Sequence, residues 1–185
     1  MSSYNRRNNA SLIRQIGQFG SMLDIEMNKR FEQKFSLSLD YMKGHDEEVA
    51  RFLANDDPET RSLALQFLFQ YCYNEKIKET LINLARSDPA NCVKTTAISL
   101  IGILRLAKEN DEDKRCARTL LDIIQDSQQS DEVKSFAYVA LIPYERNGKI
   151  NIPAHFRFPE DVNWGLLEQV NLGSCRSDGE VDPKI

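Results

Sequence analysis

Acidic and basic side chains recur together in three segments of the sequence, and this pairing is the first feature with chemical consequences. Each segment has an aspartate, a basic residue three to six positions later, and an alanine three residues after the base. An aspartate at a helix start accepts bonds from free backbone N–H groups, and a basic side chain of a neighbouring segment can donate charge-assisted hydrogen bonds to it. We therefore expect a structural ladder of acid–base contacts that joins successive segments. Its members are Asp57, Arg61, Asp88, Lys94, Asp131 and Lys134.

Side chains that hold metals or move protons are scarce. His45 and His155 are the two histidines, and neither has a cysteine or carboxylate at ligand spacing. The acidic stretch 109–113 lacks the glycine and the distal glutamate of a calcium loop. The four cysteines are far apart and form no Cys-x-x-Cys pair, which is typical of reduced thiols in a cytoplasmic protein. We predict no catalytic residue, no metal and no cofactor, and we therefore do not expect an enzyme.

The composition fits one globular domain. The chain has 185 residues and a formal charge of −4, from 24 basic and 28 acidic residues. Residues 46–150 hold 14 basic and 18 acidic residues, whereas nucleic-acid binding needs clustered Lys and Arg. No apolar run reaches the length of a membrane span. We therefore expect neither a nucleic acid nor a membrane as the partner.

The elements that must position the charged ladder are helices. Apolar residues recur at helical spacing, and Pro58 and Pro89 each follow an aspartate, which is typical of a helix start. Connections of a few residues force neighbouring helices to be antiparallel. One or two further helices are expected upstream of Gly44, because apolar residues from Leu12 to Phe35 keep the same spacing. The six main predicted helices cover 46–55, 58–73, 75–87, 89–108, 112–127 and 131–143.

The three segments resemble the HEAT-like repeat family, whose second helices open with Asp, a short gap, Val-Arg or Val-Lys, and then Ala. The alanines Ala64, Ala97 and Ala137 are 33 and 40 residues apart, a period typical of stacked helical hairpins. The match is best at Val93-Lys94 and Val133-Lys134, while Thr60 replaces the usual valine in the first copy. The resemblance implies an all-α fold, an α-α superhelix of stacked antiparallel helical hairpins of the HEAT-like or armadillo type.

This resemblance divides the chain into four parts. Residues 1–45 form an N-terminal helical cap, and 46–145 form the repeat stack of about three hairpins. Residues 146–172 form a loop and a short capping helix, and 173–185 form a disordered tail. Candidate capping side chains are Phe31 and Phe35 at the first end and Trp164, Leu166 and Leu167 at the other.

The resemblance also implies that the second helix of each hairpin lines a concave face. Positions two before and two after each repeat alanine point away from the apolar stripe, and Val139 is one of them. The resulting surface is polar, small and nearly uncharged, and it could bind a protein or simply be solvated. The predicted partner-binding residues are Ser62, Gln66, Gln70, Tyr73, Thr95, Ser99, Arg105 and Ser135.

These observations favour a non-catalytic protein–protein interaction scaffold that binds another protein through its concave face. A narrower hypothesis is an immunity protein that neutralises a toxin. Two alternatives follow from the same resemblance: an enzyme like the HEAT-repeat lyases that attach bilins, and a nucleic-acid-binding protein like the HEAT-like DNA glycosylases. No residue identifies a bilin site, and the charge balance disfavours nucleic acid.

Overall fold

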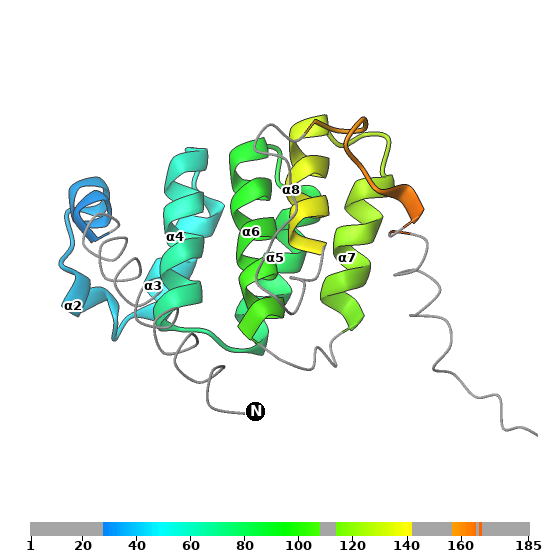
Figure 1. The fold of residues 1–185 in the computed structure, drawn as a ribbon. Coiled ribbons are helices and arrows are strands. Elements are labelled where there is room, and N and C mark those ends of the chain that lie inside the picture. Colours follow the sequence, from blue (N-terminus) through cyan, green and yellow to red (C-terminus); the bar gives the residue numbers. More distant parts are fainter. Residues whose placement is uncertain (1–27, 108–113, 142–156, 166, 168–185) are drawn as a thin grey trace, which may run out of the picture.

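The structure is a computed structural model, which describes residues 28–107, 114–141, 157–165 and 167. Residues 39 and 105–107 are described by their backbone alone. All the regular secondary structure in these ranges is helical (Figure 1). The predicted all-α class is therefore confirmed. The predicted tail 173–185 and most of the predicted helix upstream of residue 28 lie outside the described residues.

The helices follow the order expected from the sequence. Residues 28–35 are helical, and α2 (Leu39–Met42) and α3 (Asp46–Arg51) come next, with α3 passing directly into the 3-10 turn η1 (Phe52–Ala54). The main helices are α4 (Pro58–Tyr71), α5 (Glu75–Ser87), α6 (Asn91–Ala107), α7 (Lys114–Gln125) and α8 (Asp131–Leu141). Each of these five helices matches a predicted helix to within two residues. The helix predicted at 46–55 corresponds to α3 together with the 3-10 turn η1.

The helix starts explain most of these bounds. Asp57 caps α4 as predicted, because its carboxylate accepts from the N–H groups of Glu59 and Thr60. The carboxylate of Asp88 accepts from the N–H of Ala90, and α6 begins only after this turn, two residues later than predicted. At α8 the hydroxyl of Ser130 accepts from the N–H of Val133, so a serine caps this helix and Asp131 is its first residue.

The main helices form two layers. In Figure 1, α4, α6 and α8 lie side by side, and α6 packs against both of its neighbours. Their N-terminal ends lie together, since Arg61 of α4 contacts Asp88 before α6, and Asn91 of α6 donates to Ser130 before α8. The second layer contains α5 and α7, which are antiparallel to α6 and α8.

The interior between the layers is apolar and closely packed. One cluster of buried residues joins α5, α6, α7 and α8, and a second joins residues 28–77 around α4. The helices α6 and α8 approach closely where Gly102 faces Ala140, because a Cβ atom built on Gly102 would lie 3.1 Å from the Cβ of Ala140. The sequence therefore needs a glycine here for packing, in the middle of a helix where glycine is otherwise unfavourable.

Three of the predicted capping residues are packed against other parts of the chain, and one is about half exposed. Phe31 is buried and stacks on Phe67 of α4, with ring centroids 5.0 Å apart, and Phe35 packs on Phe52 at 4.2 Å. At the other end Leu167 is buried in the main cluster, whereas Trp164 is 49% exposed. Leu166 lies outside the described residues.

Candidate binding face

The outward sides of α4, α6 and α8 form one continuous surface, which we call the α4–α6–α8 face. Its exposed and half-buried side chains recur at helical spacing on each of the three helices, and Tyr73 extends the first row just beyond α4. The face consists of Ser62, Gln66, Gln70 and Tyr73; Thr96, Ser99 and Ile103; and Ser135, Phe136 and Val139.

Most of the predicted partner-binding residues lie on this face, but Thr95 does not. Thr95 is buried, with its hydroxyl donating to the carbonyl of Cys92. The prediction for Thr95 was wrong because α6 is the central helix and is covered by α4, α5 and α8, which leaves a narrow outward strip through Thr96 and Ser99. Arg105 belongs to α6, but its side chain lies outside what the structure describes. Tyr73 is exposed, as expected.

The sequence reasoning missed two apolar residues of this face, Ile103 and Phe136. Ile103 and Phe136 are 49% and 44% exposed, and Val139, which the spacing placed outward, is 41% exposed. Their signal was present in the sequence, since Ile103 lies four residues after Ser99 and Phe136 lies four after Glu132. Ile103 and Val139 lie in the later turns of α6 and α8, and Phe136 lies in the middle of α8. Along α6 and α8 the face therefore becomes more apolar toward the helix ends.

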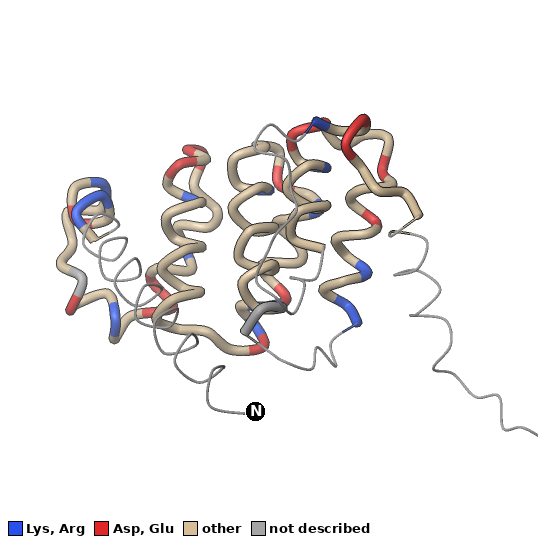
Figure 2. The backbone as a smooth tube through the Cα atoms, viewed as in Figure 1, with Lys and Arg blue, Asp and Glu red and all other residues tan. Residues whose placement is uncertain are grey.

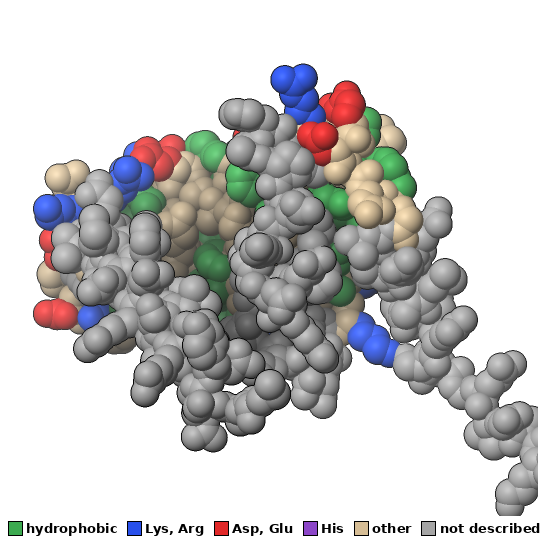
Figure 3. Space-filling model, in the orientation of Figure 1, with side chains coloured by type: hydrophobic (Ala, Val, Ile, Leu, Met, Phe, Trp, Pro, Cys, Tyr) green, Lys and Arg blue, Asp and Glu red, His purple; other side chains and the backbone are tan. Residues whose placement is uncertain are grey.

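Charge is confined to the rim of the face. Residues 62–73, 95–104 and 135–141 contain no Lys, Arg, Asp or Glu. The charged side chains of α4 and α8 next to the face are at the N-terminal ends, where Glu59 and Glu132 are exposed. Figure 2 shows acidic residues at the upper ends of α4 and α8, and Figure 3 shows uncharged side chains below the acidic group at the upper end of α4.

Three hydroxyl groups on the face make hydrogen bonds within their own helices, whereas the buried Oγ of Ser62 has no hydrogen-bond partner. Thr96 donates to the carbonyl of Cys92 at 2.8 Å, Ser99 to that of Thr95 at 2.8 Å, and Ser135 to that of Asp131 at 2.7 Å. A hydroxyl whose hydrogen bond is already made loses little when another protein covers it. The face is thus easier to desolvate than its residue types alone indicate.

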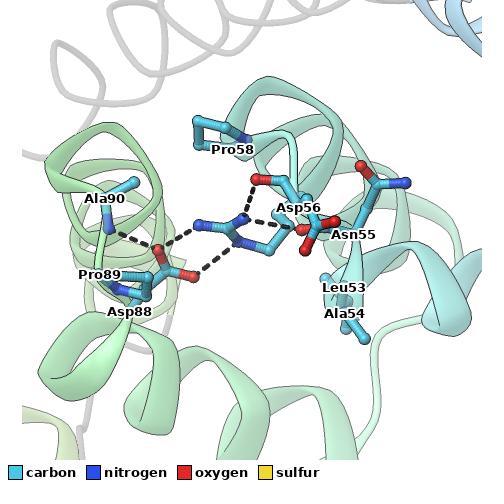
Figure 4. A pocket seen from close by; sticks show the side chains of 9 residues that line it. Leu53, Ala54, Asn55, Asp56, Pro58, Asp88, Pro89 and Ala90 are labelled. Atoms are coloured by element: carbon cyan, nitrogen blue, oxygen red, sulfur yellow. Dashed lines mark hydrogen bonds and ion pairs between the residues drawn. The ribbon is translucent and has the colours of Figure 1, made fainter.

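The charged ladder is realised in full at one junction, between α4 and α6. Arg61 donates from Nε and Nη2 to the two carboxylate oxygens of Asp88, at 2.9 and 2.8 Å (Figure 4). Both side chains are at least nine-tenths buried. The bond to Asp88 raises the pKa of the Arg61 guanidinium above its usual value.

This ion pair lines an open pocket of about 520 Å³ at the N-terminal ends of α4 and α6. Nη1 of Arg61 also donates to the carbonyls of Asn55 and Asp56, at 2.8 and 3.0 Å, so four of the five guanidinium N–H groups are used. The carboxylate of Asp88 likewise accepts from the backbone of Ala90. The pair therefore joins two helices and has little capacity left to bind an anion.

The other members of the predicted ladder have different partners. Nζ of Lys94 donates at 2.8 Å to the side-chain oxygen of Gln129, in the turn before Asp131, instead of pairing with an aspartate. Lys134 lies over the ring of Phe158, 5.4 Å from its centroid. Asp57 binds Lys34, a residue that the sequence pattern did not single out, at 2.8 Å. Lys34 and the hydroxyl of Thr60 hold the pKa of Asp57 well below its usual range.

A second pocket, of about 290 Å³, lies between α5 and α7 and gathers basic side chains. Arg86, Arg115 and Arg118 line it together with Lys114. Arg86 pairs with Asp122 at 2.8 Å and Arg115 with Glu79 at 2.6 Å. These two pairs join α5 to α7, so Arg86 and Arg115 have a structural role between the two helices of the second layer.

Three further findings concern metal binding, membrane spanning and similarity to known proteins. Within the described ranges, no group of three or more His, Cys, Asp or Glu side chains could hold a metal ion. In the same ranges, every helix is too short or too polar to cross a membrane. Comparison with known proteins finds no matching family model, and neither a curated protein nor a solved structure with significant similarity.

Proposed function

We propose that the chain is a non-catalytic interaction scaffold of the HEAT-like type, which binds another protein through the α4–α6–α8 face. In this proposal α3–α4, α5–α6 and α7–α8 are three repeats of one helical hairpin, stacked into a short superhelix. The shared direction of α4, α6 and α8 supports the repeat, as does the placement of their N-terminal ends side by side.

The observation that carries the functional proposal is the uncharged strip that crosses all three helices. Charged side chains keep most protein surfaces solvated, whereas the centres of interfaces are depleted of charge and enriched in aromatic and apolar residues. The face contains Tyr73, Ile103, Phe136 and Val139 beside hydroxyl and amide groups. It therefore has the composition of an interface centre, and Glu59 and Glu132 supply a polar rim.

The arrangement also defines the chemistry of the partner. Apolar side chains of the partner would pack on the later turns of α6 and α8, where Ile103 and Val139 are exposed. Lys or Arg at one end of the bound segment would meet the acidic rim at the helix starts. Nothing about the face favours a toxin over another protein, so the proposal stops at a protein segment of this chemistry.

The test is quantitative affinity capture with the full chain and two matched variants. Ile103→Glu adds a charge in the middle of the apolar half of the face. Asn83→Glu adds the same charge on α5, where Asn83 is exposed in the other layer. A specific partner is expected to be retained by the wild type and by Asn83→Glu and lost with Ile103→Glu, because an unpaired charge cannot be buried cheaply in an interface.

The captured protein is then purified and its dissociation constant is measured against all three proteins. Gln66→Glu, on the polar half of the face, is expected to weaken binding as well. Equal affinity for the wild type and Ile103→Glu would contradict the proposal, provided that both proteins have the same thermal midpoint. Loss with Asn83→Glu alone would assign binding to the α5–α7 layer.

A further inference from the structure

We propose that the pocket between α5 and α7 binds the phosphate group of a small molecule. This proposal does not depend on the proposed function, because the pocket lies in the second layer of helices and the α4–α6–α8 face belongs to the first. It has three supports: an excess of positive charge at the pocket, a hydroxyl group in its wall that makes no hydrogen bond to a described residue, and the charge at the start of α7.

Four basic side chains line the pocket, and none of the described residues that line it is a carboxylate. Arg115 is held by Glu79 through two contacts, at 2.6 and 2.7 Å, and Arg86 is held by Asp122 at 2.8 Å. Arg118 lies farther from Asp122, at 4.0 Å, and its side chain is 59% exposed. The two carboxylates thus orient two guanidinium groups without neutralising the pocket, and oriented guanidinium groups suit a phosphate, which accepts paired hydrogen bonds from them.

Thr119 supplies an uncharged donor in the wall of the pocket. The residue is 1% exposed, and it makes no side-chain hydrogen bond within the part of the chain that the structure describes. Its hydroxyl oxygen is nevertheless not fully enclosed, and the residue lines the pocket. A buried hydroxyl normally has a partner, so this one requires an explanation. An oxygen of a bound phosphate would accept the hydrogen bond that the hydroxyl does not make elsewhere.

The charge at the start of α7 is unfavourable for the helix by itself. The first turn contains no acidic residue, and Lys114, Arg115 and Arg118 all lie within the first five residues (Figure 2). Positive side chains at this end oppose the helix dipole, and Lys114 and Arg118 repel each other at a spacing of four residues. An anion bound beside them would offset both effects, since a helix N-terminus attracts negative charge.

The size and the surroundings of the pocket favour a single phosphate group. The volume of about 290 Å³ is close to the lower limit for small-molecule sites, roughly 300 Å³. Ile82 gives the pocket an apolar wall that a small organic group can contact. Glu79 and Asp122 lie beside the pocket, and the sequence 109–113 adds four acidic residues just before α7. A long polyanion such as a nucleic acid would be repelled by these carboxylates.

The test is calorimetric titration of the full chain with inorganic phosphate at physiological ionic strength. Arg118→Gln removes the arginine that is farthest from a carboxylate, and Arg51→Gln removes the same charge on α3, where Arg51 is exposed. We expect saturable binding to the wild type and to Arg51→Gln, and a severalfold weaker dissociation constant with Arg118→Gln. Equal weakening by the two substitutions would overturn the proposal, as would the absence of saturable binding to the wild type.

Thr119→Val tests the hydroxyl without a change of charge. It is expected to weaken phosphate binding severalfold, whereas Thr119→Ser, which keeps the hydroxyl, should bind as the wild type does. Wild-type affinity in Thr119→Val would overturn the proposed site. The thermal midpoint of each variant without phosphate shows whether it is folded, and if Thr119→Val is not, the comparison of Arg118→Gln with Arg51→Gln decides.

Two further probes identify the source of the phosphate. A phosphoserine peptide and a single-stranded oligonucleotide are titrated into the wild type and into Arg118→Gln. Neither is expected to bind more tightly than inorganic phosphate, because the carboxylates beside the pocket oppose a larger anion. Tighter binding of either probe that is lost with Arg118→Gln would overturn the assignment to a small molecule.

Discussion

The two junctions within the α4–α6–α8 layer are built from different interactions, although the sequence pattern is the same at both. Between α4 and α6, a buried guanidinium and carboxylate meet in a two-point contact, at 2.9 and 2.8 Å. Between α6 and α8, the equivalent basic residue, Lys94, makes one hydrogen bond to an amide, and Gly102 allows the helices to approach closely. The same sequence pattern thus predicts where two helices meet, but not which interactions hold them together.

The largest expected effect is at the buried ion pair. Arg61→Ala should lower the free energy of unfolding by about 3–5 kcal/mol, because the carboxylate of Asp88 would remain buried without its counter-charge. Urea denaturation of the single variants and of Arg61→Ala with Asp88→Ala measures their coupling. Strict additivity of the two substitutions would show that the pair contributes nothing beyond its separate side chains.

The close approach of α6 and α8 gives the next largest effect. Gly102→Val should lower the free energy of unfolding by about 1–3 kcal/mol, because the added side chain overlaps the Cβ of Ala140 and forces the helices apart. Combining it with Ala140→Gly should recover part of this loss. Thermal denaturation measures both proteins, and no recovery in the double variant would mean that the strain lies elsewhere.

Removing the basic residue at the second junction should have a smaller effect. Lys94→Ala is expected to cost at most about 1 kcal/mol, since its partner Gln129 is half-buried and also donates to Asp126. The same denaturation series measures it beside Arg61→Ala. Equal losses for the two substitutions would contradict the difference between the junctions.

The outermost ion pair should be visible mainly in the pH dependence of stability. Lys34 and Thr60 lower the pKa of Asp57 in the folded chain. The contribution of the Asp57 carboxylate to the free energy of unfolding is therefore complete above its unfolded-state pKa of about 3.9, and it is lost as the pH falls below that value. Asp57→Asn keeps a capping side chain but cannot ionise, so its acid limb should be shallower than that of the wild type. If the free energy of unfolding falls equally steeply with decreasing pH in Asp57→Asn and in the wild type, the lowered pKa of Asp57 is contradicted.

Much of the fold could be predicted because it depends on local signals. Pro58 after Asp57 gives the start of α4, and the apolar spacing gives the lengths of α5 and α7. The starts of the helices were less predictable, because neighbouring residues compete to cap the same helix. Ser130 precedes Asp131 and supplies the hydroxyl that caps α8, and the turn at Asp88 delays the start of α6.

The candidate face was predictable in outline only, since exposure depends on how many neighbours each helix has. Spacing from the repeat alanines placed Ser99 and Val139 outward, and both are exposed. The same rule put Thr95 outward, although α6 is covered on three sides and Thr95 is buried. The contact between Lys34 and Asp57 joins elements with no repeat relation, so no spacing rule could predict it.

The most direct test of the central claim is a footprint of the complex, measured on the purified partner bound to the wild-type chain. Hydrogen exchange and carbene labelling should show protection at Gln66, Ile103 and Val139, beyond the level in the free chain, and none at Asn83 on α5. Protection confined to α5 and α7, with the three face residues unchanged, would contradict the claim that the α4–α6–α8 face is where this protein binds.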